Sequence, residues 1–294
     1  MSERPTLRPV TIGRLVEVVD LSRKSKISTR EVADSLGVTS RRAREVLQEA
    51  NRIGLVEQSQ SGQSDVYSQS PVGSKFIQSV LSEKWSQASR ILEENSPHYD
   101  ACLKGIRSEG PIRSQELINH LNDINDEYSF NETGMTISLN WAERLDSVQR
   151  NAFSGHYYQA KKGLNTDQLL RGTITTYHEL DESTGIGLRQ KFVSIPRLRE
   201  YTCQRTKSPR DLFNSGLRKL ASANVGRVEL TGAPLDTGAK EAEFSVKQIE
   251  LDGTGAAIST EQSTDPIQSG VKIASKQHYY IAIHANDNEI VIPK

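Results

Sequence analysis

The chain contains 294 residues, a length that indicates two or three domains of ordinary size. Its 37 lysines and arginines balance its 37 aspartates and glutamates, which excludes binding to nucleic acid through net charge alone. Two cysteines, Cys102 and Cys203, are too few for a disulfide framework. No apolar run has the length of a signal peptide or a membrane span, so we expect a cytoplasmic protein without membrane contact.

Charge is placed by segment rather than spread evenly along the chain. Residues 23–52 contain eight basic and four acidic residues, and residues 189–219 contain nine basic and two acidic residues. Residues 91–164 reverse this balance, with seven basic and eleven acidic residues. Two segments are therefore candidates for contact with a polyanion, and the segment between them is a candidate for contact with protein.

The clearest local pattern lies in residues 27–56 and predicts a helix, a tight turn, a basic helix and a strand. Ser28 and Glu31 have the spacing of a capping box, in which each side chain accepts a hydrogen bond from the other residue's backbone amide. Gly37 stands where the chain leaves the first helix, and either residue of Thr39–Ser40 can cap the second.

Apolar residues recur at helical spacing in the second helix and predict its buried stripe: Ala43, Val46, Leu47 and Ala50. After it, Leu55–Gln58 and Val66–Ser68 predict a β-hairpin around the polar loop Ser59–Asp65. A further helix is predicted to open at Pro71.

Over residues 8–82 this order of elements resembles the winged helix-turn-helix superfamily of DNA-binding proteins. The resemblance implies that the second helix enters the DNA major groove and that the hairpin, or wing, contacts the minor groove or the backbone. Carried onto this chain, it implies contacts from the wing loop Gln60–Ser64, including Gln63. It also implies contacts from five residues of the helix: Ser40, Arg41, Arg42, Arg44 and Gln48. The alternative interpretation is a small helical bundle with an incidental basic face.

Residues 83–96 predict a helical linker, and residues 97–164 predict a second, degenerate winged helix. Arg113 occupies its capping position, so Ser114 is expected to cap the first helix one position later. A polar, acidic insert over residues 122–133 separates this helix from a second one over residues 136–151, which includes Trp141 as either a core or a contact residue. Phe153 and residues 156–158 predict a short aromatic hairpin. Because cations are scarce here, we expect internal packing or a protein partner rather than DNA.

Residues 165–294 predict a third winged helix, whose basic helix begins with Ser208 as the cap and Pro209 at the first helical position. The resemblance implies DNA contacts from four side chains of this helix: Arg210, Asn214, Arg218 and Lys219. It implies phosphate contacts from four cations that precede it: Arg197, Arg199, Arg205 and Lys207.

The C-terminal part alternates apolar and polar residues over several predicted strands: 243–251, 257–259, 271–273, 279–283 and 289–292. Asp252-Gly253 is a hairpin-turn signal between the first two of them. These strands form either an expanded wing of the third module or a small separate sheet, and we favour the wing.

Signals for catalysis or for a metal are weak. The chain has no phosphate-binding loop and no Cys-x-x-Cys pair. His278 and His284 are on one face of a predicted strand, but no further ligand completes a zinc site near them. Asp236, Glu243 and Lys247 fall in a strand-rich segment, although the last two are too far apart along a strand to share one phosphate. We therefore expect no enzyme, no cofactor and no metal.

Together these patterns predict an α+β, mostly helical chain of tandem winged helix-turn-helix modules with a β-rich C-terminal extension. The predicted segments are 1–82, 83–96, 97–164 and 165–294. The predicted function is recognition of double-stranded DNA, as a transcription regulator or as the DNA-recognition subunit of a larger assembly. The alternative is an adaptor that docks proteins through the acidic middle module.

Overall fold

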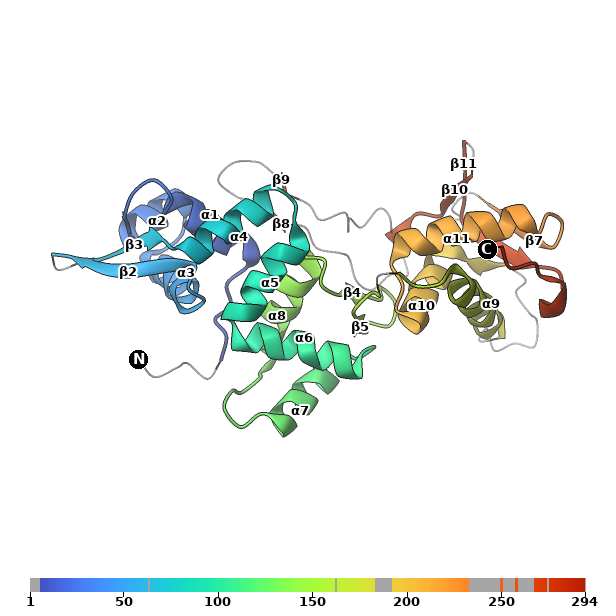
Figure 1. The fold of residues 1–294 in the computed structure, drawn as a ribbon, viewed down its shortest axis with the longest axis horizontal. Helices are drawn as coiled ribbons and strands as arrows, with labels where there is room; N and C mark the ends of the chain where they lie inside the picture. The colour runs from blue at the N-terminus through green and yellow to red at the C-terminus, as the bar shows by residue number, and fades with distance from the viewer. Residues whose placement is uncertain are drawn as a thin grey trace. The chain divides into compact units, whose positions relative to one another are not determined.

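The computed structural model describes most of the chain and is α+β, with eleven α-helices and small antiparallel sheets among the described residues (Figure 1). The described residues are 6–62, 64–161, 163–182, 192–232, 249–250, 257–258, 267–273 and 275–293. They form two compact units. The N-terminal unit comprises Met1–Val148 with Lys247–Gln262, and the C-terminal unit comprises Gln149–Val246 with Ser263–Lys294. The helices described here are too short or too polar to cross a bilayer.

The N-terminal unit begins with a helix, a strand, two helices and a hairpin. These elements are α1 (Ile12–Leu21), β1 (Ile27–Ser28), α2 (Thr29–Leu36), α3 (Ser40–Arg52), β2 (Val56–Ser61) and β3 (Ser64–Gln69). The strands form an antiparallel sheet in the order β1-β3-β2, so the last strand lies between the first two. The β2–β3 hairpin projects away from the helices (Figure 1).

Local hydrogen bonds fix α2 and α3 as the sequence predicts. The Ser28 amide donates to Glu31 Oε2 at 2.7 Å and the Glu31 amide donates to Ser28 Oγ at 3.3 Å, which completes the capping box. Gly37 adopts a left-handed φ of 61° at the end of α2, a conformation that glycine reaches without strain. Thr39, rather than Ser40, caps α3 by accepting the Arg42 amide at 3.3 Å.

The buried stripe of α3 packs into the core of this unit. Ala43, Val46, Leu47 and Ala50 are each at most 1% exposed. The next helix, α4 (Pro71–Leu81), runs so close to the end of the α3–β2 turn that its Gly73 has no room for a side chain. A Cβ atom on Gly73 would lie 2.0 Å from the Leu55 carbonyl oxygen.

Four more helices complete the N-terminal unit: α5 (Trp85–Asn95), α6 (Pro97–Glu109), α7 (Ser114–Ile124) and α8 (Glu132–Arg144). Trp141 of α8 is fully buried, and its indole Nε1 donates to the Val10 carbonyl at 2.9 Å. This tryptophan therefore belongs to the core and is not a contact surface. It joins the middle helices to the segment that leads into α1.

Two predictions about the middle helices were wrong in detail. Ser114 is the first residue of α7 rather than its cap, and only the Glu116 half of a capping box forms, with the Arg113 amide donating at 3.0 Å. Helix α8 begins at Glu132 instead of residue 136, because Asn131 accepts the Gly134 amide at 2.7 Å and caps it early. It ends at Arg144, seven residues before the predicted 151.

The C-terminal unit has the same order of elements around its own sheet. These elements are α9 (Thr166–Glu182), β6 (Val193–Ser194), α10 (Ile195–Thr206), α11 (Arg210–Ala223), β7 (Val228–Thr231) and β12 (Tyr280–Ile283). A short hairpin, β4 (Gln149–Arg150) and β5 (Tyr157–Tyr158), precedes α9. The sheet order is β6-β12-β7, again with the last strand between the first two.

The long connection between β7 and β12 contains two separate hairpins in its described parts. They are β8 (Ile249–Glu250) with β9 (Ala257–Ile258), and β10 (Val271–Ile273) with β11 (Lys276–His278). The Asp252-Gly253 turn lies outside the described residues, as do Asp236, Glu243 and Lys247. Strand β12 thus completes the sheet of the C-terminal unit, while β10–β11 is an addition to it.

Two further corrections concern the C-terminal unit. Ser208 is buried and does not cap α11, whose cap position is Pro209 and whose first residue is Arg210. The predicted strand over 289–292 is instead a 3₁₀ helix, η1 (Asp287–Glu289), followed by an extended segment. The buried side chain of Asn224 accepts a hydrogen bond from the Val291 N–H through Oδ1 at 2.7 Å and donates one to the Val291 carbonyl through Nδ2 at 2.8 Å. One side chain therefore satisfies the backbone groups that a neighbouring strand would otherwise pair.

We expect Gly73→Ala to destabilise the protein by about 1–3 kcal/mol, because the new methyl group collides with the Leu55 carbonyl. Lys75→Ala, at an exposed position of the same helix, is the matched control and should change stability by no more than about 0.5 kcal/mol. Urea unfolding followed by circular dichroism measures both. Equal midpoints for the two variants would contradict the close approach.

Candidate nucleic-acid interface

The side of α3 opposite its buried stripe is an open polar surface. Ser40, Arg44 and Gln48 recur every four residues and are all exposed, so they share one face of the helix. Arg41 lies beside them, with its side chain 91% exposed. The structure thus brings four of the predicted residues together on one surface.

The three predicted arginines of α3 differ in how much of each side chain is available. Arg42 is only one third exposed, donates to Glu45 Oε2 at 3.0 Å, and also donates to the Pro9 carbonyl. Arg41 approaches the same Glu45 more loosely, at 3.5 Å. Within the described part of the chain, no ion pair includes Arg44, which is exposed. Arg44 and Arg41 are therefore the available cations, and Arg42 mainly ties α3 to the segment before α1.

Glu45 is the acidic residue that reduces the positive charge of this surface. The hydrogen bond from Arg42 lowers the pKa of the Glu45 carboxyl, although partial burial opposes it, and the positive charges of Arg42 and Arg41 add to the lowering. The carboxylate is therefore ionised at neutral pH and offsets one positive charge of α3.

The β2–β3 hairpin beside α3 is polar but carries no cation among its described residues. Gln60, Ser61 and Ser64 are exposed near its tip, where Gly62 has a φ of 63°, and Asp65 adds a negative charge. Gln63 lies outside the described residues. The hairpin can therefore contact a partner through hydrogen bonds, and it does not supply positive charge.

Arg44 lies on the side of α3 that faces the hairpin. Burial raises the pKa of Tyr67 on β3, the negative charge of Asp65 raises it further, and the positive charge of Arg44 lowers it. Both charged groups are thus close enough to Tyr67 to act on its hydroxyl. Helix α3 and the hairpin are joined directly, since the Gln58 amide of β2 donates to Asn51 Oδ1 of α3 at 3.2 Å.

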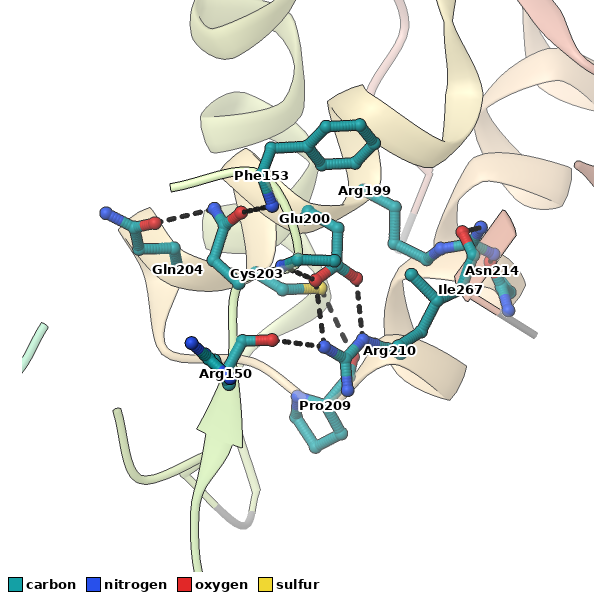
Figure 2. A network of polar contacts seen from close by, with 12 residues as sticks. Arg150, Phe153, Arg199, Glu200, Cys203, Gln204, Pro209, Arg210, Asn214 and Ile267 are labelled. Carbon is teal, nitrogen blue, oxygen red and sulfur yellow. Dashed lines mark hydrogen bonds and ion pairs between the residues drawn. The ribbon is translucent and has the colours of Figure 1, made fainter. Parts of the chain in front are cut away.

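In the C-terminal unit, the predicted phosphate contact from Arg199 was wrong. Its side chain is fully buried, where Nη1 donates to Asn214 Oδ1 at 2.9 Å and Nη2 donates to the carbonyls of Ile267 and Ser269 (Figure 2). Burial lowers the pKa of the Arg199 guanidinium, and the neighbouring Glu200 opposes this effect. A guanidinium in this position cannot reach a phosphate, and it also occupies the predicted base-contacting atom of Asn214.

The predicted DNA contact from Arg210 was also wrong. Its Nε donates to Glu200 Oε1 at 2.6 Å and its Nη2 donates to the Arg150 carbonyl at 2.7 Å (Figure 2). Glu200 is fully buried and also accepts the Ala152 amide at 2.9 Å. Burial alone would lower the pKa of Arg210, but the Glu200 carboxylate more than reverses this and raises it. This pair holds the β4–β5 hairpin against α10 and α11 and is not open to a partner.

The other predicted phosphate contacts are partly engaged. Arg197 is half-buried, with its guanidinium carbon 5.9 Å from the centre of the Tyr201 ring. Arg205 is exposed but forms a short ion pair with Glu179. Lys207 is half-buried and ends α10 at a left-handed φ of 54°. Only Arg218 and Lys219, in the second half of α11, are exposed among the residues predicted on that helix.

Sequence reasoning missed Glu200, the residue that removes Arg210 from the surface. A signal was available in the spacing of α10. Arg199 is four residues after Ile195 and four before Cys203, so it shares the buried stripe of this helix. The number of cations in a segment does not show which of them a helix directs into the core.

The described histidines and cysteines form no metal-binding group of three or more ligands. His284 Nε2 lies 3.0 Å from Glu229 Oε2 on the neighbouring strand, a carboxylate contact that the sequence did not predict. Cys102 and Cys203 are unpaired and buried, and burial raises the pKa of each thiol to about 12. Both therefore pack as small apolar residues.

Comparison with models of known protein families gives no match, and comparison with curated protein sequences gives none either. The interpretation of this surface therefore depends on its own chemistry.

We expect Arg210→Met to destabilise the protein by about 3–5 kcal/mol, because it leaves the buried Glu200 carboxylate without its cation. The double variant Glu200→Gln/Arg210→Met should recover part of this loss, since it buries no charge. Arg205→Met, which breaks an exposed ion pair, is the control and should cost no more than about 1 kcal/mol. Thermal and urea unfolding measure these changes. Unchanged stability together with weaker DNA binding in Arg210→Met would contradict the internal role.

Proposed function

We propose that the chain binds double-stranded DNA, with α3 as the recognition helix and β2–β3 as the wing of a winged helix-turn-helix module. One observation carries the proposal. Helix α3 presents Arg41, Arg44 and Gln48 on an exposed face directly beside a projecting polar hairpin.

The chemistry of this face suits the edges of base pairs. An α-helix fits the major groove, where Arg can bind guanine and Gln can bind adenine through two hydrogen bonds each. The α3 N-terminus adds unpaired backbone amides and the positive end of the helix dipole, both of which favour a phosphate. The hairpin, with its amides and hydroxyls, fits backbone contacts that depend on hydrogen bonds rather than on charge.

The same unit carries further exposed cations outside α3. Arg30 on α2 has a side chain that is 91% exposed, and Arg23, Lys24 and Lys26 are exposed in the turn between α1 and β1. These residues were not among the predicted contacts. Arg23 and Arg30 approach Asp20 and Asp34 only at 4.0 Å, and exposed ion pairs of this kind are weak enough to leave both cations available to phosphates.

The C-terminal unit repeats the order of elements of the first, which supports a tandem arrangement. Its α11 is a weaker candidate for base recognition, because Arg210 and Asn214 are engaged within the chain. We therefore assign recognition to α3. The biological role proposed for such a protein is a transcription regulator or the DNA-recognition subunit of a larger assembly, without catalytic activity of its own.

An adaptor function is the second candidate, and one observation favours it. Ile124 at the end of α7 is 66% exposed and is followed by the acidic residues Asp126 and Glu127. The negative charge of Asp126 and Glu127 is unfavourable beside DNA phosphates, so this surface fits a protein partner better than DNA. Co-purification with a fixed partner that persists at high salt would favour this candidate.

We expect Arg41→Gln/Arg44→Gln to weaken binding by at least about tenfold, since each lost contact to a base is worth about 1–3 kcal/mol. The probe is a duplex selected by the intact chain from a random-sequence pool, and fluorescence anisotropy measures the affinity. Arg90→Gln/Lys104→Gln removes two exposed cations from other helices of the same unit and serves as the control. Equal affinities for the two double variants would contradict the assignment of α3.

Replacing the acidic residue of the surface should have the opposite effect. We expect Glu45→Gln to bind the same duplex severalfold more tightly, because it removes a negative charge beside the phosphates and releases Arg41. Glu94→Gln, at an exposed position of α5, is the charge-matched control. Weaker binding by Glu45→Gln would show that the carboxylate orients the arginines and that its charge is not the dominant effect.

A further inference from the structure

The β10–β11 hairpin is an insertion that lies against α11 in the C-terminal unit (Figure 1). Arg218 Nη1 of α11 points to the Lys272 carbonyl of β10 at 3.4 Å, which places the helix at the outer edge of this strand. At the base of the hairpin, a Cβ on Gly270 would lie 1.9 Å from the His278 carbonyl oxygen. The backbone there packs so closely that only glycine fits.

Apolar residues, rather than lysines, anchor this hairpin. Val271 is buried in the core of the unit and Ile273 packs against that core. In the strand register Lys272 is opposite Gln277 and Ile273 is opposite Lys276, and the two lysines and the glutamine are exposed. The lysine side chains are therefore available without unfolding the hairpin.

Four exposed cations lie on the hairpin and on the part of α11 beside it, and we name them the hairpin surface: Arg218, Lys219, Lys272 and Lys276. In the strand register Lys272 and Lys276 extend from opposite faces of the hairpin, so they can reach phosphates on either side of it. The described residues of the hairpin include no aspartate or glutamate. The acidic residue of α11, Asp211, lies seven positions before Arg218, about 10 Å along the helix axis. Among the described residues of the hairpin and of the second half of α11, the charged side chains are therefore all positive.

We propose that the hairpin surface binds the phosphate backbone of duplex DNA and gives the chain a second contact apart from α3. This inference rests on the proposed function. Lysine ammonium groups on a short hairpin can neutralise phosphates but do not distinguish bases, and the side chains of α11 that could do so are engaged internally. A second contact on the same chain raises the effective concentration of each unit on DNA, so the hairpin surface adds affinity without adding sequence specificity.

The test measures the salt dependence of binding for the full chain on a duplex of about 40 base pairs, roughly four helical turns. Lys272→Gln/Lys276→Gln removes two cations and keeps Val271 and Ile273 in place. The matched control, Lys161→Gln/Arg171→Gln, removes two exposed cations elsewhere in the same unit. Thermal unfolding checks that both variants fold like the parent chain.

Each phosphate contact contributes about 0.9 to the slope of log affinity against log salt, so the hairpin variant should lower that slope by about 2. Its preference for the selected duplex over a random one should be unchanged. The hairpin surface is overturned if its variant matches the control while Arg41→Gln/Arg44→Gln loses affinity. If the hairpin variant lowers the slope and the α3 variant does not bind more weakly, the assignment of α3 fails and the hairpin surface stands. No binding of duplex by the parent chain overturns both.

Discussion

Pairing between arginines and carboxylates within the chain decides which of its many cations remain available to a partner. Glu200 is fully buried and takes Arg210 into the core of the C-terminal unit. Glu49, fully buried in the N-terminal unit, pairs in the same way with Arg8 and Arg52 at the far end of α3. Such carboxylates would be costly to bury without their cations, so each pair is kept as part of the structure. The cations that have no buried carboxylate partner, rather than the total charge, determine which positive charges are available at the surface.

The two units show how one order of elements can give different surfaces. In α3 the buried residues and the arginines fall on opposite sides, so Arg41 and Arg44 face outward. In α11 the corresponding polar side chains face α10, where Glu200 and Arg199 engage them. The first turn of α11 is consequently a part of the core, and the exposed cations of α11 lie in the second half of the helix, beside the inserted hairpin.

Local features were predictable because their causes lie within a few residues. The capping box at Ser28, the left-handed Gly37 and the stripe of α3 each depend on spacing alone. The inward position of Arg199 follows from the same kind of spacing, but its partner does not, because the carbonyl of Ile267 that it binds lies 68 residues further along the chain. The two hydrogen bonds between the Asn224 side chain and the Val291 backbone, found where a strand was predicted, span 67 residues. Side-chain contacts over such separations have no signature in hydrophobic periodicity.

Absence of cations from the described part of the β2–β3 hairpin has a consequence for how the proposed function would work. A wing without positive charge adds little of the salt-dependent affinity that phosphate contacts provide, so α3 and its flanking turn would have to supply it. Under the proposed function, the cationic hairpin of the other unit would supply part of this affinity. Base recognition and phosphate neutralisation would then belong to different units of one chain. Changes at α3 would alter which sequences are chosen, whereas changes at the hairpin surface would alter how tightly any sequence is held.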